Sequence, residues 1–178
     1  MVLSPVPVLV ITGPVGVGKS AVLHEADVAL VEAGIVHATV VLEEIARCWP
    51  VAASEVGTEP VGYANLASVW SNFADRGAER LLIELILEDR SQLRQLCRAV
   101  PGAEVTVVRL RAPLSLIEER LRNREPSPDS EVAAARWLAP RMDESQVEDH
   151  LVENGRRPVQ EVAAEVLLLA GWLRAHGM

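Results

Sequence analysis

The sequence predicts an α/β fold with three layers, αβα, in which a five-stranded parallel sheet lies between two layers of helices. Short apolar, β-branched runs alternate with helix-like segments about five times along the 178 residues, as in parallel sheets with helical crossovers. A glycine-rich stretch at residues 13–18 joins the first apolar run to the first helix-like segment. With 49% hydrophobic residues the chain can bury one core, so we expect a single domain over residues 1–178.

Strands are expected where the apolar runs are continuous, because a strand buried on both faces lacks polar alternation. Residues 7–12 and 35–42 fit this pattern, and 104–112 is the clearest later strand. The run at 80–87 is ambiguous between strand and helix, and its place between two helical stretches favours a strand. Residues 148–154 predict a short, weak final strand.

Helices are expected between the strands, with starts and stops given by proline and glycine. The first covers residues 19–33 and stops at Gly34. Pro113 suits the first turn of a later helix, because its missing N–H costs nothing there. The two prolines in 125–130 predict a loop. The remaining helices are expected at 63–76, 88–100, 113–124, 131–142 and 157–177.

Charge and hydropathy exclude several partners. A net charge of −8 and a pI near 5.0 argue against binding polymeric nucleic acid, which needs a basic surface. No apolar run approaches the ~18–20 residues of a membrane helix, so no membrane partner is expected. The apolar start lacks the basic region of a secretion signal, and we expect a cytoplasmic protein, either monomer or homodimer. The scattered histidines predict no dedicated metal cage.

The sharpest motif is Gly13–Ser20, which fits G-x-x-x-x-G-K-[ST] completely. Backbone N–H groups of such a loop point at phosphate oxygens, and the following helix directs its positive end at the same anion. Lys19 is expected to reach the β- and γ-phosphates of ATP, and the Ser20 hydroxyl to ligate Mg²⁺. The alternative is a turn that only links strand to helix. The residues expected to contact the nucleotide are Gly13, Pro14, Val15, Gly16, Val17, Gly18, Lys19, Ser20 and Ala21.

With this loop, the run "EDRSQLRQLCRAVPGAEVTVVRLRAPLSLIEERLRNRE" at 88–125 resembles the small P-loop kinases, the group of gluconate, shikimate and adenylylsulfate kinases and chloramphenicol phosphotransferase. The resemblance implies a P-loop NTPase fold with a short lid at about 120–135. It also implies that Arg120 and Arg124, expected on one helical face, contact the transferring phosphate. The alternative is a solvated helix face, which we prefer for Arg122.

The resemblance also points to an acceptor site beside the second strand. Related kinases place an Asp there, and this chain has Glu43 and Glu44 instead. We expect Glu43 to contact the acceptor or act as general base, with Arg47 steadying an anionic or polyhydroxyl acceptor. The alternative is an exposed acidic pair at the start of a helix. Asn65 lies in the helical segment where these kinases build the acceptor site, and we expect it to contact the acceptor, whereas Trp70 and Phe73 of the same segment are expected to pack in the core.

Two further sites follow the later strands. Glu88 comes after the third apolar run, where a carboxylate would lie beside Mg²⁺, although a helix N-terminus also favours acids. Arg90 opens the same helix and is expected to face the acceptor. Arg157 lies where similar kinases hold adenine, with a simple turn as the alternative.

The leading function is an ATP-dependent phosphotransferase that moves the γ-phosphate to a hydroxyl of a small molecule, with ATP and Mg²⁺ as cofactors. One alternative is a nucleoside monophosphate kinase, in which Arg47, Arg76 and Arg90 hold the second phosphate. Another is a nucleotide-binding regulatory protein with weak or no kinase activity.

Overall fold

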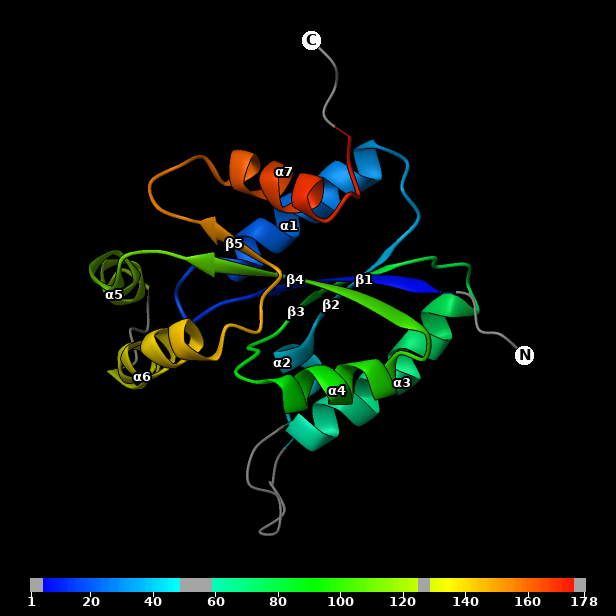
Figure 1. Cartoon of the computed structure of the whole chain (residues 1–178), viewed down its shortest axis with the longest axis horizontal. Helices are drawn as coiled ribbons and strands as arrows, with labels where there is room; N and C mark the ends of the chain where they lie inside the picture. Colours follow the sequence, from blue (N-terminus) through cyan, green and yellow to red (C-terminus); the bar gives the residue numbers. More distant parts are fainter. Residues whose placement is uncertain (1–4, 49–58, 125–128, 175–178) are drawn as a thin grey trace.

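The sheet of the computed structural model has five strands, all parallel, in the order β2-β3-β1-β4-β5. The structure describes residues 5–48, 59–124 and 129–174. Figure 1 shows the carboxyl ends of β4 and β5 pointing to the same edge of the sheet. The strands are β1 (Val6–Thr12), β2 (Ala38–Val41), β3 (Leu81–Glu84), β4 (Ala103–Arg111) and β5 (His150–Glu153).

Helices cover both faces of the sheet, which confirms the predicted α/β fold (Figure 1). On one face lie α1 (Lys19–Glu32) and α7 (Val159–Leu169), and on the other α3 (Glu59–Ala74) and α4 (Arg90–Ala99). The one-turn α2 (Leu42–Ile45) follows β2 directly. The pair α5 (Leu114–Arg122) and α6 (Asp129–Ser145) lies beyond the carboxyl end of β4.

Two hydrophobic clusters hold these layers together. In β1, Leu9 and Ile11 pack into the cluster shared with α1 and α7, whereas Val8 and Val10 pack with α3 and α4. Successive side chains of a strand point to opposite faces, so an unbroken apolar run supplies both clusters. The central strand is therefore fixed from both sides, and the loop that follows it starts from a firm position.

Several predicted boundaries were wrong. The strand predicted at 80–87 ends at Glu84, and the one predicted at 35–42 covers only Ala38–Val41. The helix predicted to run to 177 ends at Leu169, because Gly171 adopts φ +68° and its N–H bonds the carbonyl of Leu168. The loop predicted at 125–130 lies partly outside the described residues, and its last two residues already belong to α6.

Candidate active site

The phosphate loop between β1 and α1 has a backbone that only glycine accommodates. Gly16 has φ +79° and Gly18 has φ +105°, both in the left-handed region. A Cβ at Gly16 would lie 2.6 Å from Cγ of Leu121, and one at Gly18 would lie 2.6 Å from Nδ2 of Asn154. The glycine spacing of the motif therefore reflects close packing against α5 and the end of β5 as well as the turn itself.

Two side chains hold this loop from outside. Nδ2 of the buried Asn154 donates a hydrogen bond to the carbonyl of Val17 over 2.8 Å. Nη1 of Arg120 donates to the same carbonyl at 3.0 Å and to that of Asn154 at 3.1 Å, and Nη2 donates to the carbonyl of Gly155 at 2.6 Å. Burial lowers the pKa of Arg120. The structure thus gives Arg120 a positioning task on the loop, which differs from the predicted contact with a transferring phosphate.

Lys19 lies beside the carboxylate of Glu84, a residue that was not predicted from the sequence to belong to the site. Its Nζ lies 3.8 Å from Oε1 of Glu84, the last residue of β3, and Ser20 Oγ donates to the same oxygen over 3.0 Å. Lys19 is only 8% exposed. Burial lowers its pKa, against the opposing effect of Glu84 and Glu43. Burial also raises the pKa of Glu84, while Lys19 and Ser20 favour its ionised form.

The oxygen atoms around Glu84 suit Mg²⁺, because this ion prefers oxygen ligands. Bound Mg²⁺ usually also retains several water molecules and binds phosphate oxygens of the substrate. Oε2 of Glu84 is buried without a hydrogen-bond partner among the described residues, and the Ser20 hydroxyl lies beside it. Within the described part of the chain, no three His, Cys, Asp or Glu residues are grouped as they would be to hold a metal ion. Glu88, the residue predicted to ligate Mg²⁺, lies four residues beyond the end of β3 and lines the pocket described next, whereas Glu84 accepts the hydrogen bond from Ser20.

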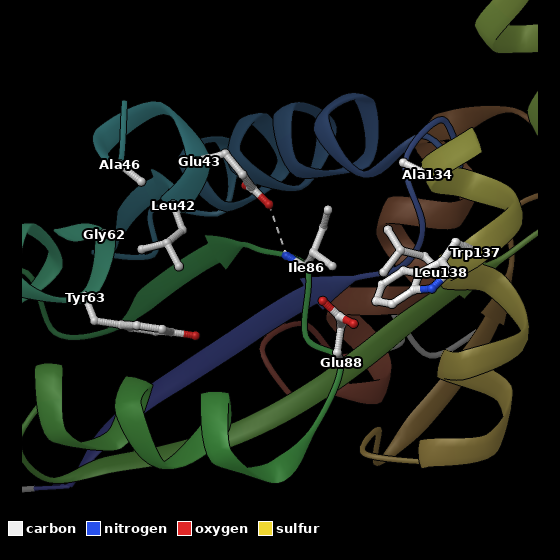
Figure 2. Close-up of a pocket in the computed structure, with 10 residues that line it drawn as sticks. All are labelled: Leu42, Glu43, Ala46, Gly62, Tyr63, Ile86, Glu88, Ala134, Trp137 and Leu138. Atoms are coloured by element: carbon white, nitrogen blue, oxygen red, sulfur yellow. Dashed lines mark hydrogen bonds between the residues drawn. The ribbon is translucent and has the colours of Figure 1, made fainter. Parts of the chain in front are cut away.

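A pocket of about 290 Å³, here called the Glu43 pocket, opens beside the ends of β2 and β3 (Figure 2). Oε1 of Glu43 accepts a hydrogen bond from the backbone N–H of Ile86 over 3.1 Å, and its Oε2 is buried with no partner in the part of the chain described. Glu88 points into the same pocket from the other side of Ile86. The lining residues are Leu42, Glu43, Ala46, Gly62, Tyr63, Ile86, Glu88, Ala134, Trp137 and Leu138.

Three residues predicted near the acceptor do not line this pocket. Arg47 is 74% exposed and forms an ion pair with Glu44 at 2.8 Å on the surface. Asn65 donates to the carbonyl of Ile45 over 2.7 Å and joins α3 to α2. Arg90 is exposed at the first turn of α4. The single turn of α2 therefore places Glu43 toward the pocket and Glu44 toward solvent.

One wall of the Glu43 pocket comes from α6, which the sequence reading left out of the site. Ala134, Trp137 and Leu138 form this wall, and the guanidinium of Arg141 stacks on the Trp137 ring at 4.2 Å from its centroid. Trp137 remains 53% exposed. An exposed tryptophan in the middle of an otherwise alanine-rich helix was the signal that could have identified this wall.

A second pocket, of about 420 Å³ and here called the Arg157 pocket, lies on the other side of the phosphate loop. Arg157 binds Glu165 at 2.6 Å at its edge. Arg124 lies 3.8 Å from Glu131 and falls beyond the end of α5 at Arg122, so the prediction that it shares a helical face with Arg120 was wrong. The residues that line the Arg157 pocket are Gly16, Gly18, Ala21, Arg120, Asn123, Arg124, Asn154, Arg157 and Val159.

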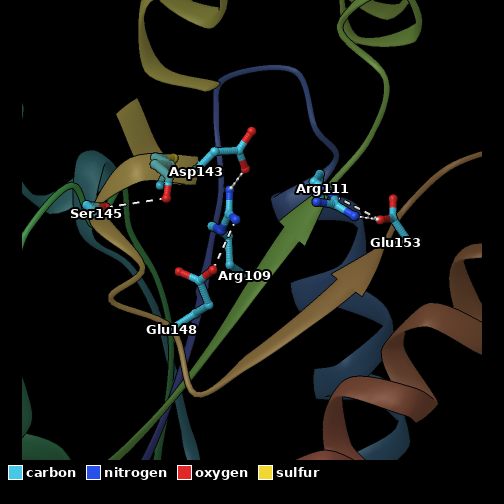
Figure 3. A network of polar contacts seen from close by, with 7 residues as sticks. Arg109, Arg111, Asp143, Ser145, Glu148 and Glu153 are labelled. Carbon is cyan, nitrogen blue, oxygen red and sulfur yellow. Dashed lines mark hydrogen bonds and ion pairs between the residues drawn. The ribbon is translucent and has the colours of Figure 1, made fainter. Parts of the chain in front are cut away.

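A buried arginine fixes the far end of α6 to the sheet (Figure 3). Arg109 of β4 pairs with Asp143 of α6 at 2.7 Å and with Glu148 at 3.0 Å. Two residues further along β4, Arg111 pairs with Glu153 of β5 at 2.5 Å. The ion pair of Arg109 with Asp143 orients α6, and with it the Trp137 wall, relative to the sheet, while the pair of Arg111 with Glu153 joins β4 to β5.

Three solved structures share this fold. The tunicamycin resistance protein of Deinococcus radiodurans matches with a TM-score of 0.66 and 21% identity, over 94% of this chain and 97% of that chain. A gluconokinase from Sinorhizobium meliloti matches with 0.62 and 20% identity, over 95% and 94% of the two chains. The APS kinase of Mycobacterium tuberculosis, in complex with AMPPNP and APS, matches with 0.61 and 21% identity, over 95% and 99%.

These likenesses confirm the predicted fold resemblance to the P-loop kinases. No family model and no curated protein matches the chain. Among the helices that the structure describes, none is both long and apolar enough to cross a bilayer.

Proposed function

We propose that the protein is an ATP-dependent phosphotransferase that moves the γ-phosphate of ATP to a hydroxyl group of a small molecule. The observation that carries the proposal is the meeting of Lys19, Ser20 and Glu84 at the start of α1. Lys19 also interacts electrostatically with Glu43, which lines one pocket, and with Arg124, which lines the other. A cation that acts on charged residues of both pockets suits the transfer of a phosphoryl group from one bound molecule to the other.

The nucleotide would occupy the Arg157 pocket, with its phosphates on the loop. The N-terminus of α1, which follows the glycine turn directly, favours the negative charge of the phosphate oxygens. Lys19 would stabilise charge on the γ-phosphate oxygens. Ser20 and Glu84 would hold Mg²⁺, which when bound offsets negative charge on the β- and γ-phosphates.

The acceptor would lie in the Glu43 pocket with its hydroxyl beside Oε2 of Glu43. In the transfer, the hydroxyl oxygen forms a bond to the γ-phosphorus while the bond from that phosphorus to the bridging oxygen breaks, and ADP leaves. The hydroxyl proton passes to the Glu43 carboxylate. Positioning and charge stabilisation supply most of the rate in such a reaction, so Glu43 orients the nucleophile as well as accepting its proton.

A transfer assay with paired variants tests the proposal. We expect Lys19→Ala to abolish acceptor-dependent ADP release and Glu43→Gln to lower kcat by about 10²-fold or more, with little change in the Kd of ATP. Glu44→Gln, the solvent-facing neighbour paired with Arg47, is the matched control and should keep wild-type rates. Equal rates for Glu43→Gln and Glu44→Gln would contradict the role given to Glu43.

A further inference from the structure

We infer that the acceptor carries no negative charge: it is a hydroxyl-bearing molecule, neutral or cationic, with an apolar or aromatic body. This inference rests on the proposed function and names the substrate class of the same site. Its basis is the composition of the Glu43 pocket, whose walls are apolar and aromatic while its charged groups are the carboxylates of Glu43 and Glu88 (Figure 2).

The pocket has no guanidinium or ammonium group to receive an anion among its lining residues. Acceptors with a phosphate, sulfate or carboxylate need such groups, because a buried anion is otherwise unpaired. Three nearby cations do not line the pocket: Arg47 pairs with Glu44 on the surface, Arg141 stacks on the indole of Trp137, and Lys19 lies 3.8 Å from Glu84 at the phosphate loop. The segments outside the described residues, 1–4, 49–58, 125–128 and 175–178, contain no arginine or lysine in sequence.

The carboxylates add repulsion to this lack of cations. An acceptor with its own negative charge would approach Glu43 and Glu88 in a largely apolar pocket, where like charges are weakly screened. Oε2 of Glu43 is buried and has no hydrogen-bond partner among the residues that the structure describes, which favours instead a molecule that donates a hydrogen bond. This charge pattern also disfavours the nucleoside monophosphate alternative, whose acceptor is a dianion.

The walls specify the rest of the acceptor. Leu42, Ile86 and Leu138 supply aliphatic surface, and Trp137 adds a large aromatic surface that is half exposed in the free protein. Such surface gains most from an apolar or aromatic group, which removes it from water. A volume of about 290 Å³ fits a small molecule at the lower end of ordinary ligand pockets.

Matched pairs of acceptors test the inference. Benzyl β-glucuronide has a carboxylate where benzyl β-glucoside has its C6 hydroxymethyl group, and AMP has a phosphate ester where adenosine has its 5′-hydroxyl. Both anionic members keep the secondary hydroxyls of their neutral partners. Binding is measured by calorimetry with AMPPNP and Mg²⁺ present, and turnover by ADP release with ATP. We expect the Kd of the neutral member of each pair to be at least about tenfold lower than the Kd of its anionic partner. Equal or tighter binding of the anionic members overturns the inference.

A charge reversal gives a second, independent arm. Glu88→Arg should improve the relative affinity for the anionic members by about tenfold or more, because it replaces repulsion by attraction. Glu104→Arg makes the same charge change on an exposed residue at the opposite end of β4 and should leave the preference unchanged. An unchanged preference in Glu88→Arg contradicts the inference. If the proposed phosphotransfer is wrong, no acceptor stimulates ADP release, and the binding preference still decides the acceptor's charge.

Discussion

Ser20 donates a hydrogen bond from its Oγ to Oε1 of Glu84 over 3.0 Å, and this bond joins the end of the phosphate loop to the end of β3. The two residues are 64 positions apart in sequence, and the parallel pairing of β1 with β3 brings them together. Because the carboxyl ends of parallel strands share an edge, the pairing of a loop hydroxyl with a carboxylate of the adjacent strand is a direct product of the topology.

Glu84→Gln should keep the fold but weaken Mg²⁺-dependent activity by about 10- to 100-fold, the range typical of residues that hold or orient a metal. The amide preserves the hydrogen bond from Ser20 but removes the negative charge beside Lys19. Activity measured over a Mg²⁺ titration gives the result. Glu79→Gln, an exposed residue before β3, is the control, and equal Mg²⁺ profiles for both variants would contradict the assignment.

Arg120→Ala should raise the Kd of ATP by about tenfold, because it removes three hydrogen bonds that hold the loop and the Asn154–Gly155 backbone. The affinity for the acceptor should stay unchanged, since Arg120 does not line the Glu43 pocket. Titration calorimetry with each ligand separates the two effects. Arg122→Ala, on the exposed side of the same helix, should leave the Kd of ATP as it is in the wild type.

Gly16→Ala and Gly34→Ala distinguish a close contact from backbone strain alone. Both glycines have positive φ, which costs an alanine about 1–2 kcal/mol. Only Gly16 would place its new Cβ against Leu121, whereas nothing lies within 4 Å of the one at Gly34. Denaturant unfolding should therefore show a clearly larger loss for Gly16→Ala, with ATP affinity reduced in that variant alone. Equal losses would mean that the packing of the loop against α5 contributes nothing.

Acid should weaken the tie between α5 and α6. Hydrogen bonds from Arg136 and Arg122 lower the pKa of Glu118 to about 2, from the usual 4.5 of a glutamate. Because the folded pKa is depressed, the stabilisation is complete above the unfolded value and is lost as the pH falls from about 4.5 through 2. The difference in Tm between wild type and Glu118→Gln should be largest near neutral pH and shrink toward pH 2. A difference independent of pH would exclude an ionic contribution.

Sequence reading recovered the order of strands and helices and the phosphate loop, because apolar runs and glycine spacing are local signals. It missed Glu84, since this acid lies inside an apolar run that looked like a strand continuing to residue 87. It also chose Arg90 from its place in the chain, whereas the orientation of α4 leaves that side chain exposed. Tertiary packing decides whether Glu43 or Glu44 of the short helix α2 faces the pocket. It also decides that α6, which is distant in sequence, forms a wall of that pocket.

The pocket wall formed by Trp137 shows why the contribution of a distant helix was not predicted. Helix α6 was predicted, but its position over the Glu43 pocket depends on the ion pairs of Arg109 with Asp143 and Glu148. These partners are 34 and 39 residues from Arg109 along the chain. No local pattern specifies such a pairing.

Transfer of the γ-phosphate of ATP to a hydroxyl in the Glu43 pocket is measured most directly with ATP labelled at the γ-phosphate. Wild type and Lys19→Ala are compared in the presence and absence of a neutral hydroxylated acceptor. We expect a labelled phosphomonoester of the acceptor and an equal amount of ADP with the wild type alone. Tight binding of ATP by the wild type with no labelled ester from any acceptor that occupies the pocket would contradict it.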